Sequence, residues 1–285
     1  FTYLTSGRDL ARMLAKRETK SSEIVLANPA FGLAQERPIE ASQSRKTERA
    51  MSGRTKSITN TRSLSETYFA PLSGTEQEAR TIHGLFPNAR VLIGDAATET
   101  SVKQVAGPRI LHLATHGFFL EDSIDNRAKG LDSAGAVRTQ GMENPLVRSG
   151  LALAGANRRN GGKDDGILTA LEASGLDLWG TKLVVLSACD TGLGEVRNGE
   201  GVYGLRRSFV LAGAESLVMS LWPVSDRVTR ELMTGYYKNL KQGLGRGESL
   251  RRVQLEMLKR PDRRHPFYWA SFIQSGEWAN LDGKR

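Results

Sequence analysis

The sequence predicts an α/β protein built as an open sandwich, with a mostly parallel central sheet and helices on both faces. Short apolar runs recur along the chain, and the clearest are RILHLATHG at 109–117 and KLVVLSACDTG at 182–192. Continuous apolar runs are typical of strands that are buried on both faces. Segments with apolar residues at helical spacing separate these runs, and such alternation indicates parallel strands joined by helical crossovers.

The expected strands are apolar runs that stop at a turn-forming or reactive residue. The first run, at 23–29, ends in Asn-Pro, which favours a turn after a buried strand. A further apolar run lies at 149–156. The remaining strands are expected at 89–95, 109–117, 182–192, 215–226 and, rich in aromatic side chains, 265–276.

The expected helices place apolar residues three and four positions apart, with charges on the other positions. Ser73 is a candidate N-cap of the first helix. Acidic residues open the segment at 164–178, where the helix dipole favours negative charge. The helices are expected at 73–86, 97–106, 164–178 and 201–214, followed by two basic helices within 227–264.

The length of 285 residues allows one large core, and we expect one domain from residue 22 to residue 285. Residues 1–21 are expected to be the tail of an upstream helical module, because the stretch DLARMLAKR has helical spacing and the chain begins with Phe. Polar stretches without periodicity, at 33–70 and 118–145, predict long inserted loops. Loops of this length can fold over a neighbouring site and regulate it.

The formal net charge is +9, and residues 227–264 hold eleven Lys and Arg against four acids. We interpret these charges as solvated faces of amphipathic helices; a basic α/β nucleic-acid-binding domain is an alternative. No zinc-finger spacing, RNP-like aromatic run or helix-turn-helix pattern supports that alternative, so contact with nucleic acid is expected only through a larger complex. No apolar stretch has the length of a membrane span, and no signal pattern opens the chain, so a cytoplasmic protein is expected.

The single cysteine, Cys189, cannot form an intramolecular disulfide or build a zinc site, so we expect no metal and no cofactor. Alone, it is either a buried apolar side chain or a reactive thiol. Its position favours reactivity, because Cys189 and His116 both end apolar runs at the carboxyl ends of expected strands, where ligands collect in open α/β sheets. Gly117 and Gly192 leave room for a substrate nearby.

These residue types match acyl transfer to cysteine followed by hydrolysis. An imidazole accepts the proton of a thiol and so activates it. The backbone N–H groups of Gly117 and Cys189 are candidate donors to a tetrahedral oxyanion.

Several blocks resemble, in order and spacing, the CHAT family of caspase-like peptidases, which is related to separases, gingipains and caspases. The blocks are ILHLATHGFF, LVVLSACDTG, GVYGLRRSFVLAGA, SLVMSLWPVSD and HPFYWASFIQSG. The resemblance covers about residues 22–280 and implies a caspase-haemoglobinase-like three-layer sandwich. It also implies a Cys-His dyad, with His116 as general base, Cys189 as nucleophile, and the N–H groups of Gly117 and Cys189 as oxyanion hole.

Two acids are candidates for selecting a basic residue before the cleaved bond. Asp226 follows the run LWPVS, where the related separases carry such an acid, and Asp190 follows Cys189 directly. A carboxylate there would bind Arg or Lys by a charge-assisted hydrogen bond. The alternatives are that Asp226 is the N-cap of the next helix and that Asp190 steadies its own loop. Glu195 and Glu200 are weaker candidates.

The other histidines have no expected catalytic role. His112 shares a strand face with His116 but lies deeper in the run, so a core histidine with a hydrogen-bond partner is favoured over a supporting role. His83 is expected on a surface helix, and His265 precedes Pro266.

The predicted function is therefore that of a cysteine endopeptidase acting on a protein substrate. The resemblance implies activation by an upstream helical-repeat (TPR-like) sensor region or by a partner, in bacterial signalling, cell death or defence. A second hypothesis is a catalytically inactive caspase-like scaffold or interaction module.

Overall fold

The structure is a computed structural model that describes residues 7, 11, 15, 17–33, 67–120, 145–158, 162, 164–187, 200–222 and 224–284. Its strands are β1 (Ile24–Pro29), β2 (Arg90–Gly94), β3 (Ile110–Ala114), β4 (Gly117–Phe119), β5 (Ser149–Ala152), β6 (Ile167–Thr169), β7 (Leu183–Leu186), β8 (Ser216–Ser220) and β9 (Phe272–Gly276). Its helices are α2 (Ser73–Leu85), α3 (Glu99–Lys103), α4 (Ala170–Ala173), α5 (Glu200–Leu211), α6 (Asp226–Lys241), α7 (Arg246–Lys259) and α8 (Pro266–Trp269).

In the described ranges the central sheet has six strands in the order β2-β1-β3-β7-β8-β9. Every neighbouring pair is parallel except β8 with β9. The strand order reverses at β1, so the carboxyl ends of β1 and β3 form the switch point at which open α/β sheets bind ligands. A smaller antiparallel sheet, in the order β4-β5-β6, lies beside this edge. The predicted mostly parallel sheet is confirmed.

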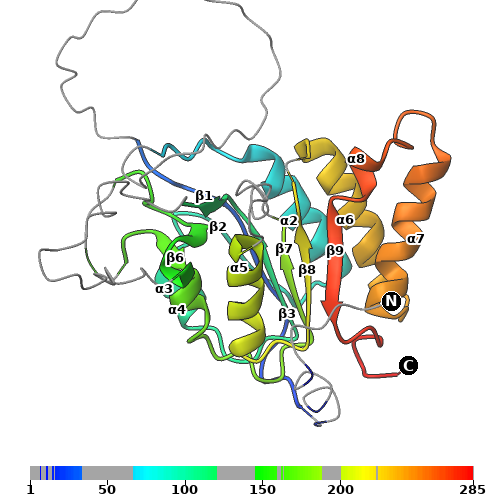
Figure 1. Ribbon diagram of the computed structural model, residues 1–285, viewed down its shortest axis with the longest axis horizontal. Coiled ribbons are helices and arrows are strands. Elements are labelled where there is room, and N and C mark those ends of the chain that lie inside the picture. Colours follow the sequence, from blue (N-terminus) through cyan, green and yellow to red (C-terminus); the bar gives the residue numbers. More distant parts are fainter. Residues whose placement is uncertain are drawn as a thin grey trace, which may run out of the picture.

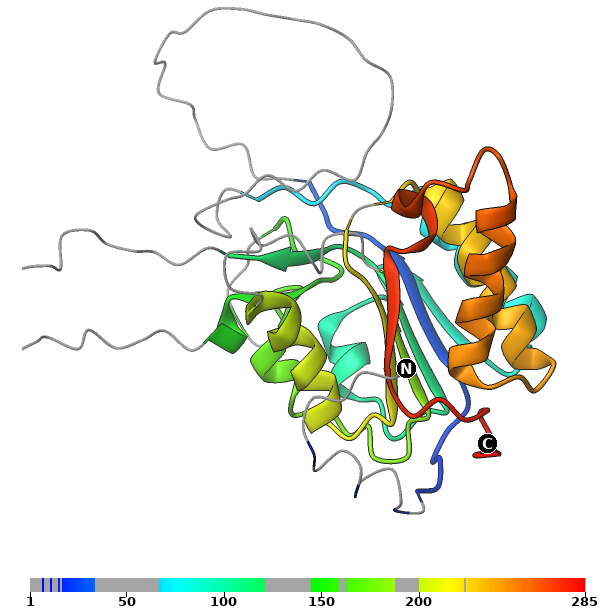
Figure 2. The same cartoon turned by 45° about the vertical axis from the view of Figure 1, so that its right-hand side comes forward.

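The central sheet lies between two layers of helices, as Figures 1 and 2 show. Helices α2, α6 and α7 cover one face, and α3, α4 and α5 cover the other. On β3, Ile110 and Ala114 join the core beneath α2 and α6, whereas Leu111 and Leu113 join the core beneath α5. The predicted three-layer sandwich is therefore confirmed, and even-numbered residues of β3 face α2 and α6.

The expected helix at 164–178 is wrong in its first half. Ile167–Thr169 pair with β5 as strand β6, and the helix α4 begins only at Ala170. Thr169 caps α4 because its hydroxyl accepts from the Glu172 N–H at 3.2 Å, while the Glu172 carboxylate accepts from the Thr169 N–H at 2.9 Å. A strand followed at once by a short amphipathic helix has the apolar spacing of one longer helix, which explains the error.

Two other boundaries also differ from the prediction. The last aromatic-rich segment begins as the short helix α8, and only Phe272–Gly276 form the strand β9. The N-cap position of α2 is Leu72, with no side-chain cap, so Ser73 is the first helical residue.

The two long loops predicted at 33–70 and 118–145 lie mostly outside the described residues, at 34–66 and 121–144. Their described ends are the irregular segment 67–72 and the strand β4. Within the described ranges, no helix has the length and apolar character that crossing a membrane requires.

Candidate active site

His116 lies just beyond the carboxyl end of β3, at the switch point of the sheet. Its side chain is 2 % exposed. β5 holds the main chain at His116, because the Ala152 N–H donates to the His116 carbonyl at 2.9 Å. Gly117, the next residue, begins β4 and pairs with Leu151. The predicted position of His116 at a strand end is therefore correct.

The imidazole of His116 is oriented by two phenyl rings and one carbonyl. The ring centroids of Phe31 and Phe69 lie 5.2 and 5.8 Å from its own. Nε2 lies 2.7 Å from the carbonyl oxygen of Ala70, in the segment that leads into α2. A carbonyl only accepts hydrogen bonds, so the proton of the neutral ring is on Nε2, and Nδ1 keeps the lone pair that a base needs. No sequence pattern pointed to Ala70, because a main-chain carbonyl is present in every residue type.

Three further predicted site residues, Cys189, Asp190 and Glu195, lie outside the described residues. The last described residue before them is Ser187, which directly follows β7. β7 is the neighbour of β3 in the sheet, so the described part of the chain brings the strand that leads to Cys189 beside the strand that leads to His116. Glu200 begins α5.

Asp226 is the first residue of α6 and not its N-cap, which is Ser225. The N-cap interpretation of Asp226 is therefore wrong. Its carboxylate packs instead against the first turn of α2: a Cβ added to Gly74 would lie 2.5 Å from Asp226 Oδ2. The free N–H groups and the positive dipole end of a helix favour a carboxylate at such a place.

The remaining histidines lie where they were expected. His112 is completely buried on β3, with Nδ1 2.9 Å from the Tyr237 hydroxyl and Nε2 3.1 Å from Glu78 Oε1. His83 is exposed on α2. His265 caps α8 by accepting from the Phe267 N–H at 3.2 Å.

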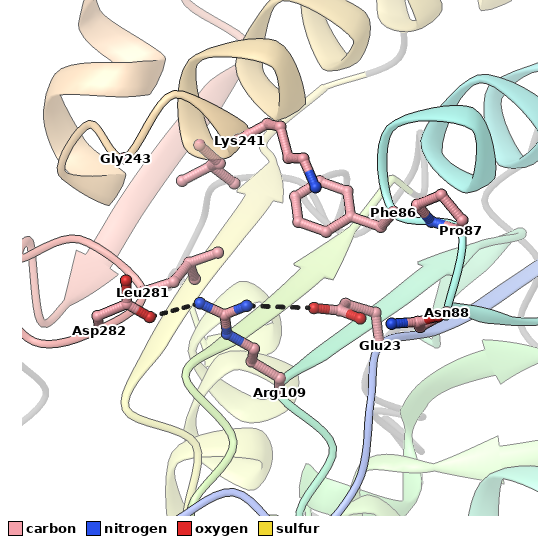
Figure 3. Close-up of a pocket in the computed structure, with 10 residues that line it drawn as sticks. Glu23, Phe86, Pro87, Asn88, Arg109, Lys241, Gly243, Leu281 and Asp282 are labelled. Carbon is pink, nitrogen blue, oxygen red and sulfur yellow. Dashed lines mark hydrogen bonds and ion pairs between the residues drawn. The ribbon is translucent and has the colours of Figure 1, made fainter.

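A pocket of about 250 Å³ opens at the other end of the sheet, between the amino ends of β1 and β3 and the C-terminal segment. Figure 3 shows Arg109 between Glu23 and Asp282, at 3.6 and 2.6 Å. Lys241 lies above the Phe86 ring, 5.2 Å from its centroid. Charges of both signs are paired across this pocket, and His116 lies at the opposite edge, so the pocket is separate from the candidate active site.

The basic segment 227–264 holds several of its positive charges in ion pairs. Arg251 and Arg252 both pair with Glu248, and Arg260 and Arg263 share Glu231. These pairs support the interpretation of solvated helix faces. In the part of the chain that the structure describes, no three His, Cys, Asp or Glu side chains gather as metal ligands.

The sheet order, the helices on both faces and the buried His-Gly pair at the end of β3 define a caspase-like α/β protein. The family model of the CHAT domain matches residues 1–277. The chain belongs to the CHAT family.

Two curated relatives carry the name Tetratricopeptide repeat protein 28. The protein from Mus musculus is 32 % identical over 116 residues, which cover 41 % of this chain and 5 % of the relative. The protein from Homo sapiens is 27 % identical over 222 residues, which cover 75 % of this chain and 9 % of the relative. The matched regions thus span less than a tenth of the length of these relatives.

Proposed function

We propose that this CHAT domain is a cysteine endopeptidase that cleaves a protein substrate through a dyad of His116 and Cys189. The register of β3 against β7 carries the proposal: every paired β3 residue faces the residue 73 positions later, as Ile110 faces Leu183. The same interval separates His116 from Cys189. Neighbouring parallel strands run about 4.8 Å apart, so chains that keep this register leave the sheet side by side.

The alternation of side chains supports the same pairing. His112 on β3 and Ser187 after β7 both contact Glu78 of α2, so both side chains are on the α2 face of the sheet. An alternation of side chains that continued beyond Ala114 and Leu186 would reach His116 from His112, and Cys189 from Ser187, in steps of two. Imidazole and thiol are then expected on one face.

In the proposed reaction, Nδ1 of His116 takes the proton of the Cys189 thiol, and Sγ attacks the carbonyl carbon of the scissile bond. The N–H groups of Gly117 and Cys189 stabilise the oxyanion of the tetrahedral intermediate. The protonated imidazole then gives its proton to the leaving amine, and a thioester remains on Cys189. Water, deprotonated by Nδ1, hydrolyses the thioester and frees the thiol.

Asp226 and Asp190 are the proposed selectors of a basic residue before the cleaved bond. The contact of Asp226 with Gly74 gives its carboxylate a structural use as well. If Asp226 selects the substrate, Asp226→Asn lowers kcat/KM for Arg-containing peptides but not for matched neutral peptides. If it only supports α2, the variant lowers both equally.

The proposed partner is an upstream helical-repeat (TPR-like) sensor region or a separate activating protein, in the cytoplasm. The guanidinium of Arg17 lies 4.4 Å from the centre of the Trp179 ring and donates to the Gly213 carbonyl at 2.9 Å. Trp179 is 50 % exposed, and Leu211, at the end of α5, is 47 % exposed, which suits contact with another apolar segment. The names of the two relatives support a tetratricopeptide repeat as that segment. A setting in bacterial signalling, cell death or defence stays a prediction.

The first test compares cleavage of a broad peptide and protein library by the wild type, Cys189→Ala and His116→Ala. Both variants are expected to lose at least about 10³-fold in kcat/KM, because removing one member of such a dyad removes the activated nucleophile. His83→Ala is the matched control, since it deletes an imidazole that is exposed on α2. Thermal unfolding of every variant checks that the fold is kept.

Undiminished proteolysis by Cys189→Ala would contradict the proposal. Absence of turnover by the wild type, with the upstream region and partners supplied, would favour the inactive scaffold. The nucleic-acid alternative requires binding that weakens steeply with salt, because phosphate contacts release counterions.

A further inference from the structure

Four buried polar side chains meet near the carboxyl ends of β3 and β7, on the face that α2 and α6 cover. They are Glu78 of α2, His112 of β3, Ser187 after β7 and Tyr237 of α6, and we call them the carboxyl-edge cluster. None of the four is more than 2 % exposed. Polar groups removed from water in this way are stable only when they pair with one another.

The contacts form a chain that ends at the carboxylate of Glu78. The Tyr237 hydroxyl lies 2.9 Å from His112 Nδ1. His112 Nε2 lies 3.1 Å from Glu78 Oε1, within ion-pair distance but without the alignment of a hydrogen bond. The Ser187 hydroxyl donates to Glu78 Oε2 at 3.2 Å.

The proton positions follow from the partners. A carboxylate only accepts, so the proton of a neutral His112 is on Nε2, and Nδ1 accepts from Tyr237. Burial raises the pKa of the Tyr237 hydroxyl well above its ordinary value, and the negative charge of Glu78 raises it further, so the hydroxyl keeps its proton. Tyr237 then donates to His112, and Ser187 donates to Glu78, which His112 Nε2 approaches to 3.1 Å.

The cluster precedes both members of the proposed dyad along the sequence. His112 precedes His116 by four residues on one strand, and Ser187 precedes Cys189 by two residues on the next. The end of β7 is held from two directions, because the Ser187 N–H donates to the Leu113 carbonyl at 3.0 Å and its hydroxyl donates to Glu78. The side-chain bond therefore reaches from α2 to the last described residue before the thiol.

We propose that Glu78 is a positioning residue, which holds the carboxyl end of β7 through Ser187 so that the following thiol is directed at the imidazole of His116. The inference rests on the proposed function. His112 and Tyr237 hold Glu78 in turn. Stability alone does not account for the cluster, since apolar side chains of similar volume commonly replace buried ionic groups without loss.

The test uses the alkylation of the single cysteine by iodoacetamide as a function of pH, because this readout needs no peptidase activity. Only the thiolate reacts, so the pH at which the alkylation rate inflects reports the pKa of the Cys189 thiol. The variants are Ser187→Ala and Glu78→Gln. Ser216→Ala is the matched control, since the Ser216 hydroxyl is equally buried and bonds to the Lys182 carbonyl at the other end of β7, at 2.7 Å.

The wild type is expected to show an inflection below the value of about 8.5 for an unperturbed cysteine. Ser187→Ala and Glu78→Gln are expected to move the inflection toward that value and to slow alkylation at pH 6.5 by about tenfold. Ser216→Ala is expected to lower the unfolding temperature by a similar amount and to leave the inflection unchanged. Circular dichroism and thermal unfolding verify that each variant is folded.

Two results would overturn the inference and can be told apart. A wild-type inflection near 8.5 means that the thiol has no activating partner, which overturns the proposed dyad and the positioning role together. A low wild-type inflection that persists in both folded variants, or moves as much in Ser216→Ala, overturns the positioning role alone.

Discussion

The parallel strands hold a cluster of polar side chains at each end, and the two clusters differ in burial and in chemistry. At the amino ends, Lys182, Glu215 and Arg246 form an amino-edge cluster. Lys182 Nζ lies 2.7 Å from Glu215 Oε1, and Arg246 Nη1 lies 3.4 Å from Glu215 Oε2. Full charges of opposite sign thus face one another there. The carboxyl-edge cluster instead surrounds one carboxylate with an imidazole and two hydroxyls.

The two clusters also connect different parts of the chain. Lys182 Nζ donates to the Arg17 carbonyl at 2.7 Å, and Arg246 Nε donates to the Ala279 carbonyl at 2.8 Å. The amino-edge cluster therefore ties the first and last described segments to the sheet. The carboxyl-edge cluster joins core helices and strands and reaches Ser187. The role of each cluster therefore depends on the segments that it connects, because those segments are affected when a member of the cluster is replaced.

The largest expected effect is the destabilisation caused by Arg246→Met. Arg246 is completely buried, and its replacement removes a charge partner of Glu215 and the donor to the Ala279 carbonyl. Hydrogen bonds from a charged donor contribute about 1.5–3 kcal/mol, and Glu215 keeps Lys182 as its partner when Arg246 is replaced. Urea unfolding, followed by far-UV circular dichroism, should show a lower midpoint with an unchanged slope, and the midpoint shift multiplied by the slope gives the lost free energy of unfolding.

Arg251→Met is the matched control, because Arg251 is on the same helix and pairs with Glu248 at the surface. An exposed pair contributes less than about 1 kcal/mol, so this variant should unfold near the wild-type midpoint. Arg246→Met that stays folded in the absence of urea should keep the wild-type alkylation profile of Cys189. Equal stability of the two variants, or a changed alkylation profile, would break the distinction between the two clusters.

The sequence was sufficient to predict the layers of the fold, because the strands of the central sheet are buried on both faces. Val184 and Val185, for example, belong to the cores on opposite faces of β7. It was insufficient for the small antiparallel sheet. Strand β6 is only Ile167–Thr169, and it is stabilised by pairing with β5, which is distant in sequence. Short strands of this kind depend on tertiary pairing that no local pattern encodes.

The candidate site, too, could be predicted only in part from the sequence. His116 could be predicted because a reactive side chain followed by glycine at a strand end is a local pattern. The Ala70 carbonyl that orients it comes from a distant segment and has no residue-type signal. Glu78 has the helical spacing of an ordinary surface acid, yet it is 2 % exposed and faces His112. Its role depends on how α2 packs on the sheet, which the sequence pattern does not specify.

A smaller effect is expected from Tyr237→Phe, which removes a single oxygen atom from the carboxyl-edge cluster. The change leaves the buried Nδ1 of His112 without its partner, which costs about 1–2 kcal/mol. Because Ser187 and Glu78 remain, the alkylation rate of Cys189 should fall by less than it does in Ser187→Ala. A rate that falls further than in Ser187→Ala would place the controlling contact at Tyr237 instead of Glu78.

The smallest effect is expected from Tyr236→Phe, at the adjacent position of α6. Tyr236 is as completely buried as Tyr237, but among the described residues its hydroxyl has no hydrogen-bond partner. Burial raises the pKa of this hydroxyl, against the opposing charge of Arg246, so it stays neutral beside the amino-edge cluster. Removing an unpaired buried hydroxyl should leave the free energy of unfolding unchanged or raise it by up to about 1 kcal/mol. Tyr236→Phe and Tyr237→Phe are matched variants, since each deletes one phenolic oxygen from a buried residue of α6. A loss of stability as large as that of Tyr237→Phe would show that the Tyr236 hydroxyl has a partner too, and the amino-edge cluster would then extend into α6 as the carboxyl-edge cluster does.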